Sequence, residues 1–175
     1  AKIYSDLYPD DEMIIGDAHN YLLENYNKYD FIWSSPPCQT HSQIRYNLGV
    51  INRGTKAVYP DMKLYEEILF LQWYYKGKWV VENTRGFYDP LIPPRFVGSH
   101  YLWSNFYIEY IELGNRNHRD GTVESLQKRK QIDLSSYDII NKRQILRNCV
   151  EPELGLHIIN QSRGIKIHKD QLSIF

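Results

Sequence analysis

Cysteine is scarce in this sequence. The 175 residues contain only Cys38 and Cys149, and two cysteines without a regular spacing argue against both a disulfide framework and a zinc site. We therefore expect no metal centre. Each cysteine has to be interpreted from its own neighbours along the chain.

Charge of one sign and long apolar runs are also lacking. The 21 Lys and Arg residues balance 21 Asp and Glu residues, so no broad basic field points to nucleic acid, and a DNA partner would depend on a local patch. No run of about 18 apolar residues is present, which excludes a membrane-spanning helix, and the first residues do not resemble a signal peptide. These absences predict one soluble, cytoplasmic domain.

Short apolar runs alternate with segments of helical spacing. We predict strands at residues 12–15, 29–34 and 78–82, and helices at residues 19–26 and 61–75. Residues 39–60 are expected to form a long loop that acts as a lid. Residues 101–113 predict a long strand or a hairpin arm, residues 114–137 are polar without a period, and residues 138–160 predict a helix broken at Pro152. The alternation indicates βαβ units and a parallel sheet.

The most informative stretch begins where the second predicted strand ends. Pro36 and Pro37 follow this strand, and each proline fixes φ and removes a backbone donor. Cys38 is thereby presented on a stiff turn at the carboxyl edge of the sheet, where open α/β sheets bind ligands. A thiolate there can act as a nucleophile, whereas a lone cysteine is more often a small buried apolar residue.

A second polar group ends the next predicted strand. Glu82, Asn83 and Thr84 follow the apolar pair Val80 and Val81. A parallel sheet would place this strand end beside that of the first, so a thiol and a carboxylic acid would face one cleft. This pair supplies a nucleophile and a general acid.

Four motifs together resemble those of the DNA (cytosine-5) methyltransferases. They are Gly16-Asp17-Ala18, Pro37-Cys38-Gln39, Glu82-Asn83-Thr84 and the stretch from Lys142 to Pro152, in the order that the family has. The resemblance spans most of the chain. It implies an α/β, Rossmann-like class I methyltransferase fold with a mostly parallel sheet, S-adenosylmethionine as methyl donor, and double-stranded DNA with a flipped-out cytosine as substrate.

The resemblance also implies a role for individual residues. Cys38 would attack C6 of cytosine, Glu82 would act at N3, and Asn83 would fix the turn that aims Glu82. The methyl donor would be held by four residues, and for one of them, Asp17, capping of a helix is an equally good interpretation. The four are Asp17, Pro36, Asn148 and Val150.

DNA contacts are expected from the lid and from a short variable region. The lid residues are Gln39, Ser42 and Arg45, and His100 would lie near the cytosine. The variable region, residues 113–138, separates a partial catalytic domain at 1–112 from a C-terminal helix at 139–175 that completes it. Its candidate contacts are Arg116, Arg119 and Arg129, for which a plain surface loop is the competing interpretation.

Some family features are missing. The glycine-rich motif that holds the methionine end of the donor and the acidic residue that binds its ribose are absent, so we expect an N-terminally truncated fold whose missing segment, or a complementing chain, supplies that half. Three alternatives stay open: an amino-methyltransferase, which Ser35-Pro36-Pro37 fits but the following Cys38 does not; a tRNA cytosine-5 methyltransferase; and a non-catalytic DNA-binding remnant.

Overall fold

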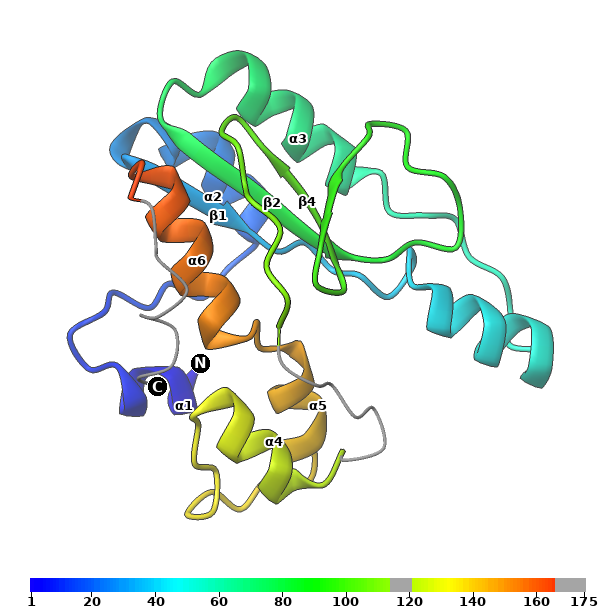
Figure 1. The fold of residues 1–175 in the computed structure, drawn as a ribbon. Helices are drawn as coiled ribbons and strands as arrows, with labels where there is room; N and C mark the ends of the chain where they lie inside the picture. Colours follow the sequence, from blue (N-terminus) through cyan, green and yellow to red (C-terminus); the bar gives the residue numbers. More distant parts are fainter. Residues whose placement is uncertain (114–120, 166–175) are drawn as a thin grey trace.

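The computed structural model describes residues 1–113 and 121–165. Helices and strands follow one another along this part of the chain (Figure 1). They are α1 (Lys2–Leu7), α2 (Ala18–Asn25), η1 (Tyr26–Lys28), β1 (Phe31–Ser34), η2 (Arg45–Ile51), α3 (Lys63–Tyr74), β2 (Lys78–Thr84), β3 (Arg95–Val97), β4 (His100–Ser104), α4 (Val123–Lys130), α5 (Lys142–Asn148) and α6 (Pro152–Ser162). The described chain is thus mixed α/β, as the sequence predicts.

The four strands form one mixed sheet in the order β1-β2-β4-β3. Only β1 and β2 are parallel, and both pairs that involve β4 are antiparallel. The prediction of a mostly parallel sheet is therefore wrong. The connection from β1 to β2 runs through α3 and can be parallel, whereas β3 and β4 are joined by Gly98 and Ser99 alone, and a two-residue turn joins only antiparallel strands. Gly98 has a φ of 63°, which favours glycine.

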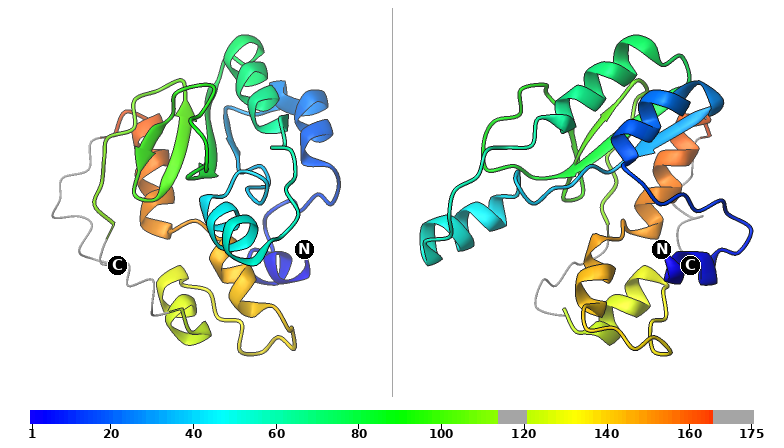
Figure 2. Two further views of the ribbon diagram at one scale, coloured as in Figure 1. Left: turned by 90° about the vertical axis from the view of Figure 1, so that its right-hand side faces the viewer. Right: turned by 180° about the vertical axis from the view of Figure 1, so that it is seen from behind.

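Helices cover both faces of the sheet (Figures 1 and 2). Successive residues of β2 point to opposite faces: Val81 packs with Leu71 of α3, and Val80 packs with Leu154 of α6. Both valines are fully buried. Because both faces are covered, the residues of β2 from Trp79 to Val81 are all apolar and buried, and the first polar residue after them is Glu82.

A separate group of helices lies below the sheet in Figure 1. Leu126, Leu134 and Leu146 form its core, with Ile3 of α1 packed against them. Residues 114–137 were expected to have no period, and this is wrong for the part that forms α4. The helix begins after Thr122. The Thr122 side chain caps it by accepting a hydrogen bond from the Ser125 N–H at 3.2 Å. Only two of its eight residues are buried, so its apolar spacing is too sparse to read from the sequence.

Three other expectations about elements need correction. Residues 12–15 form no strand, and the exposed Ile14 and Ile15 pair with no strand of the described chain. The strand expected at 101–113 ends at Ser104, whose Oγ donates to the Phe106 carbonyl at 2.7 Å. The expected loop at 39–60 contains the helical segment η2.

The remaining helix predictions are confirmed. Residues 19–26 and 61–75 correspond to α2 and α3, and the helix expected at 138–160 is broken before Pro152 into α5 and α6. Gly77, beyond α3, is needed for close approach, because a Cβ there would lie 2.8 Å from the Asp30 carbonyl oxygen. In the described parts of the chain, no helix is long and apolar enough to cross a membrane.

Candidate functional site

The carboxyl ends of β1 and β2 lie side by side because these two strands are parallel. Asn83, at the end of β2, is 2% exposed. Its Nδ2 donates to the Pro36 carbonyl at 3.0 Å, and its Oδ1 accepts the Thr84 N–H at 3.0 Å. One buried amide therefore ties the turn that carries Cys38 to the strand that carries Glu82.

Cys38 and Glu82 influence each other at this edge. The Cys38 thiol is half-buried, and burial raises its pKa, with a further increase from the negative charge of Glu82. Burial disfavours a thiolate, and so does a neighbouring carboxylate. The thiol is consequently protonated in the free chain, and a thiolate forms more readily when Glu82 is neutral.

Glu82 has a direct hydrogen-bonding partner in His100. Glu82 faces Leu102 across the β2–β4 pair, and His100 lies two residues before Leu102 on β4. Diagonal neighbours of this kind share a face of the sheet and are within reach of long side chains. His100 Nδ1 is 2.6 Å from Glu82 Oε1.

The Cys38 turn is also fixed on its other side. The His41 and Ser42 N–H groups both donate to the Cys38 carbonyl at 3.0 Å. Beyond the turn, Phe87 N–H donates to the His41 carbonyl at 3.0 Å, and Ser42 forms an isolated bridge with Gly86. The first residues of the segment 39–60 are therefore attached to residues 85–88, which follow β2.

His41 is a buried residue of this site that sequence reasoning missed. Its Nε2 is 3.0 Å from the Asp61 carbonyl, and its Nδ1 is 2.6 Å from the Tyr88 hydroxyl. A carbonyl only accepts, so Nε2 carries the hydrogen and Tyr88 donates to Nδ1. Burial lowers the pKa of His41, which favours this neutral form. No sequence signal could have found it, because its partners are 20 and 47 residues away.

A cavity of about 880 Å³ lies along β1 and reaches Pro36 and Pro37, next to Cys38. Its lining combines the aromatic side chains of β1 with the first turn of α2, and it includes Asp17. Asp17 caps α2 through a 3.0 Å bond from the Asn20 N–H, which is the first cause of its lowered pKa. The capping role that the sequence suggested for Asp17 is confirmed.

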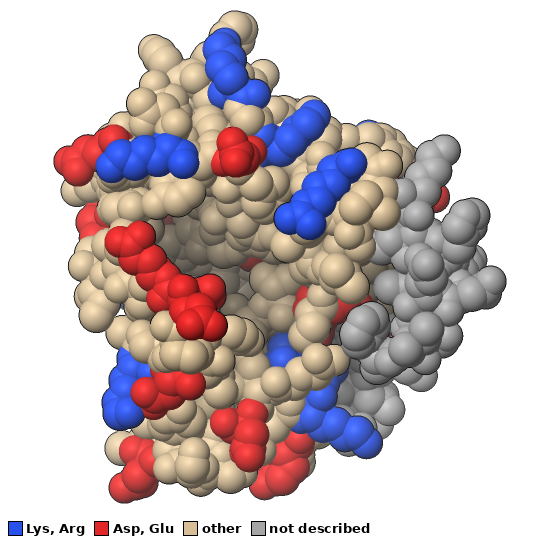
Figure 3. All heavy atoms as spheres, turned by 90° about the vertical axis from the view of Figure 1, so that its left-hand side faces the viewer, with Lys and Arg blue, Asp and Glu red and all other residues tan. Residues whose placement is uncertain are grey.

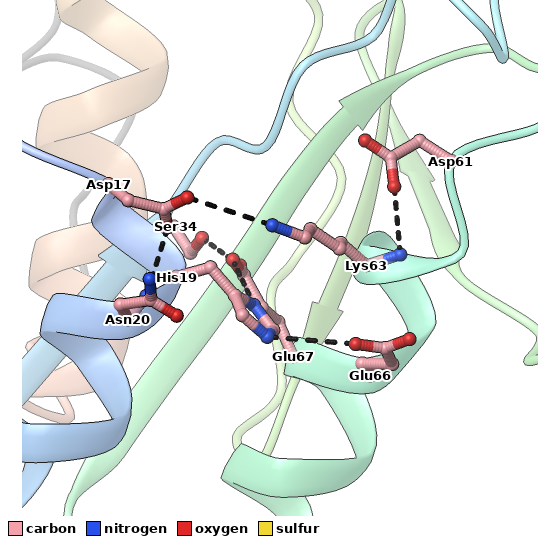
Figure 4. A network of polar contacts seen from close by, with 8 residues as sticks. All are labelled: Asp17, His19, Asn20, Ser34, Asp61, Lys63, Glu66 and Glu67. Carbon is pink, nitrogen blue, oxygen red and sulfur yellow. Dashed lines mark hydrogen bonds and ion pairs between the residues drawn. The ribbon is translucent and has the colours of Figure 1, made fainter.

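A polar network joins residues that line this cavity (Figure 4). Glu67 of α3 is 5% exposed; it accepts from Ser34 Oγ at 2.5 Å and lies 3.2 Å from His19 Nδ1. Lys63 Nζ, also on α3, is 3.7 Å from Asp17. The network joins α2, β1 and α3, and none of its members except Asp17 was singled out from the sequence.

The size and lining of this cavity are typical of a small-molecule site. Small-molecule sites are mostly apolar clefts of roughly 300–1,000 Å³ with a few polar groups, and here Asp17 and Pro36 both line the cavity. The other two expected donor contacts do not. Asn148 is exposed and accepts from Gln144 Nε2 at 3.0 Å, while Val150 packs against the core beside α6.

The expected DNA-contacting residues are scattered. Gln39 is exposed, and Arg45 is half-buried at the start of η2, which extends away from the sheet in Figures 1 and 2. Arg129 Nε is 3.3 Å from Glu151. Arg116 and Arg119 lie outside the described residues.

The distribution of charged and metal-ligating side chains limits which ligands this surface could bind. On the face shown in Figure 3, acidic and basic side chains are interspersed around a central hollow, so this face is not uniformly basic. Within residues 1–113 and 121–165, no group of three or more His, Cys, Asp or Glu side chains could hold a metal ion.

Comparisons of the chain with family models, curated proteins and solved structures found no match.

Proposed function

We propose that this chain transfers a methyl group to C5 of a cytosine in DNA, with Cys38 as nucleophile and Glu82 as general acid. The observation that carries the proposal is the hydrogen bond from Asn83 to the Pro36 carbonyl. It holds a half-buried thiol and a carboxyl group at the same edge of the sheet, where the charge of Glu82 acts on Cys38.

These two groups suit the electronic demands of cytosine. The C5 carbon is a poor nucleophile until the Cys38 thiolate forms a bond to C6, which moves the electrons of the C5–C6 double bond toward C5. Glu82 donates a proton to N3 and neutralises the charge that develops on the ring. The Cys38 thiol gives its proton to water before the attack. After methyl transfer, water takes the proton from C5, the electrons of the C5–H bond form the C5–C6 double bond again, and the Sγ–C6 bond breaks to release the thiolate.

The cavity beside Pro36 is the proposed site of S-adenosylmethionine, which supplies an electrophilic methyl group when it is bound. Asp17 and the aromatic lining would hold its nucleoside part. Pro36 and Pro37 line this cavity. The cavity therefore reaches the turn that carries Cys38, the proposed nucleophile.

The target base has to leave the DNA duplex to reach this edge, at a cost of a few kcal/mol. The arm around η2 suits contact with DNA. Residues 39–60 include Arg45, Arg53 and Lys56 but no Asp or Glu, so this segment is locally basic although the whole chain is neutral. Basic side chains of this kind bind phosphates without reading the sequence.

The test uses S-adenosylmethionine and a duplex that contains 5-fluorocytosine. Fluorine at C5 cannot leave as a proton does, so the wild-type chain should stay covalently attached to the DNA after methyl transfer. Cys38→Ala should form no covalent complex, and Glu82→Gln should lower the rate of methyl transfer to ordinary DNA by about 10²–10⁴-fold. Cys149→Ala is the matched control, since the Cys149 thiol only donates to the Ile145 carbonyl.

Methyl transfer that survives Cys38→Ala would contradict the proposal. It would favour an amino-methyltransferase, which needs no thiol. Transfer to a tRNA but not to duplex DNA would keep the chemistry and change the substrate. A wild-type chain that binds DNA and transfers no methyl group to either would favour the non-catalytic alternative.

A further inference from the structure

The Glu82 carboxyl group has two oxygen atoms, and within residues 1–113 and 121–165 only one of them has a hydrogen-bonding partner. Oε1 is 2.6 Å from His100 Nδ1, whereas Oε2 accepts no hydrogen bond from these residues. The Glu82 side chain is 12% exposed and that of His100 is 23% exposed. The pair is thus largely shielded from water, and its geometry is set by the protein.

We propose that His100 is a positioning residue for Glu82: its Nδ1–H occupies Oε1, so that Oε2 is the oxygen that gives its proton to the base. This inference rests on the proposed function. It assigns His100 to the general acid itself, whereas the sequence suggested that His100 contacts the substrate.

The backbone already orients the two side chains toward each other. Glu82 and His100 lie on the same face of neighbouring antiparallel strands, offset by two residues. Both strands are in the centre of the sheet, since β2 pairs with β1 and β4 pairs with β3. A side chain on a central strand has little freedom to shift, which is the condition that a positioned acid requires.

Other charged groups near this site have partners elsewhere. The Arg95 guanidinium, on β3, lies 4.0 Å from the centre of the Tyr107 ring. The Arg85 guanidinium lies 6.0 Å from the centre of the Phe96 ring. Among the described residues, the Glu82 charge acts on Cys38, and the Glu82 carboxyl group is in direct contact with His100.

The proton balance needs no transfer from His100. When Glu82 acts, its Oε2–H bond breaks and an N3–H bond forms on the cytosine. The carboxylate that remains spreads its charge over both oxygens, and Oε1 keeps the charge-assisted bond from Nδ1. The proton returns from N3 to Oε2 when the Sγ–C6 bond breaks. His100 therefore stabilises the form of Glu82 that appears during the reaction and restrains its rotation.

The experiment compares His100→Ala with His100→Gln, since the glutamine amide can still donate to Oε1. We expect His100→Ala to lower kcat by about 100-fold without changing the Kd for DNA, and His100→Gln to recover part of that loss. His157→Gln is the matched control. His157 is a buried histidine on α6 whose Nε2 donates to the Glu109 carbonyl at 2.8 Å, away from this site.

Proton NMR of the free chain gives a readout that does not depend on activity. A short Nδ1–H bond to a carboxylate places its proton downfield of the amide region, and we expect this signal to vanish in both His100→Ala and Glu82→Ala. Persistence of the signal in Glu82→Ala would overturn the inference. A loss of DNA affinity with kcat unchanged in His100→Ala would also overturn it, in favour of a DNA contact.

The role of His100 and methyl transfer by the chain can be tested separately. If the wild-type chain methylates DNA and His100→Ala is as fast, only the role of His100 is wrong. If the wild-type chain transfers no methyl group, the proposed function fails and the role of His100 in that reaction fails with it. In that case the NMR signal still reports whether His100 and Glu82 are paired.

Discussion

Cys38 is a thiol whose charge depends on its surroundings. Burial is the larger cause of its raised pKa, and the Glu82 charge is the smaller one. A resting thiol at this position is protected from adventitious oxidation and alkylation, because the thiolate is the reactive form. The same carboxyl group that suppresses the thiolate would, once protonated, allow it to form.

This coupling can be measured without any substrate. In a Cys149→Ala background, Glu82→Gln should lower the pKa of Cys38, because a neutral amide no longer opposes the thiolate. The rate of iodoacetamide alkylation should reach half of its plateau at a lower pH than in the parent chain. The pKa should stay above that of a free thiol, since burial is unchanged.

Glu66→Gln is the control for this measurement. Glu66 is exposed on α3 and approaches His19 at 3.6 Å, so its removal should leave the Cys38 profile in place. Identical midpoints in the Glu82→Gln chain and its parent would show that the two groups are too far apart to interact.

At the scale of elements, His41 connects three segments that the sequence separates. It lies in the turn after Cys38. Its Nδ1 accepts a hydrogen bond from the Tyr88 hydroxyl, beyond β2, and its Nε2–H donates to the Asp61 carbonyl, just before α3. The Asp61 N–H in turn donates to Thr40 Oγ1 at 2.9 Å. The two ends of the segment 39–60 are therefore held together beside the Cys38 turn, while η2 between them extends outward.

The lowered pKa of His41 predicts how stability depends on pH. Between the folded pKa and the ordinary value of 6.5, the unfolded chain binds a proton that the folded chain does not. Stability should therefore fall as the pH drops below about 7 and continue to fall until the folded chain is also protonated. Urea unfolding at pH 7.5, 6.5 and 5.5, followed by tryptophan fluorescence, measures this dependence.

His41→Gln should remove part of this decline, because glutamine does not titrate. The variant is expected to be less stable than the wild type at pH 7.5, where the buried hydrogen bonds are weakened, and to lose less stability on acidification. Parallel declines in both chains would mean that other groups cause the dependence.

At the scale of the whole molecule, the described chain has one apolar core on each face of the sheet and a third core among helices. The sheet packs between α3 and α6, while α1, α4 and α5 surround their own leucine cluster. A buried ion pair links them: Lys130 Nζ of α4 is 3.0 Å from Glu151, which precedes α6. The helical group therefore spans the expected variable region and part of the expected C-terminal segment.

Leu146→Ala tests whether these cores unfold separately. Leu146 is fully buried in the helical group, so its truncation should cost about 3 kcal/mol. Hydrogen exchange should show lost protection in α4 and α5, with β2 unaffected. Leu156→Ala, at a 41% exposed position on α6, is the control. Equal loss of protection in β2 would mean that the molecule is one cooperative unit.

Local patterns were enough to predict much of the site. The apolar runs before Ser34 and Glu82 predicted β1 and β2, and α3 between them predicted their parallel pairing. Asp17 before an apolar period predicted its capping bond. These features depend on residues that are close in the sequence, where spacing and propensity carry information.

Local patterns failed where the outcome depends on a distant partner. Residues 12–15 have the composition of a strand, but a strand also needs a neighbour with which to pair, and the described sheet offers them none. The aromatic run after residue 100 is strand-like over its whole length, yet it pairs only as far as Ser104, which lies opposite Val80 of β2. Local patterns also failed to predict the burial of His41, Glu67 and Lys130. Most of the groups to which these side chains bond lie 20 or more residues away in the sequence.

The sequence by itself determined the alternation of strand and helix, the two polar strand ends and the identity of the groups placed there, because these are set by short-range apolar spacing and by backbone restriction at Pro36 and Pro37. Only the tertiary structure decided that the sheet is mixed, that Asn83 joins the Cys38 turn to β2, and that His100 faces Glu82. The pairing of distant strands chooses these neighbours, and no local property of the chain encodes which side chain will meet which across a sheet.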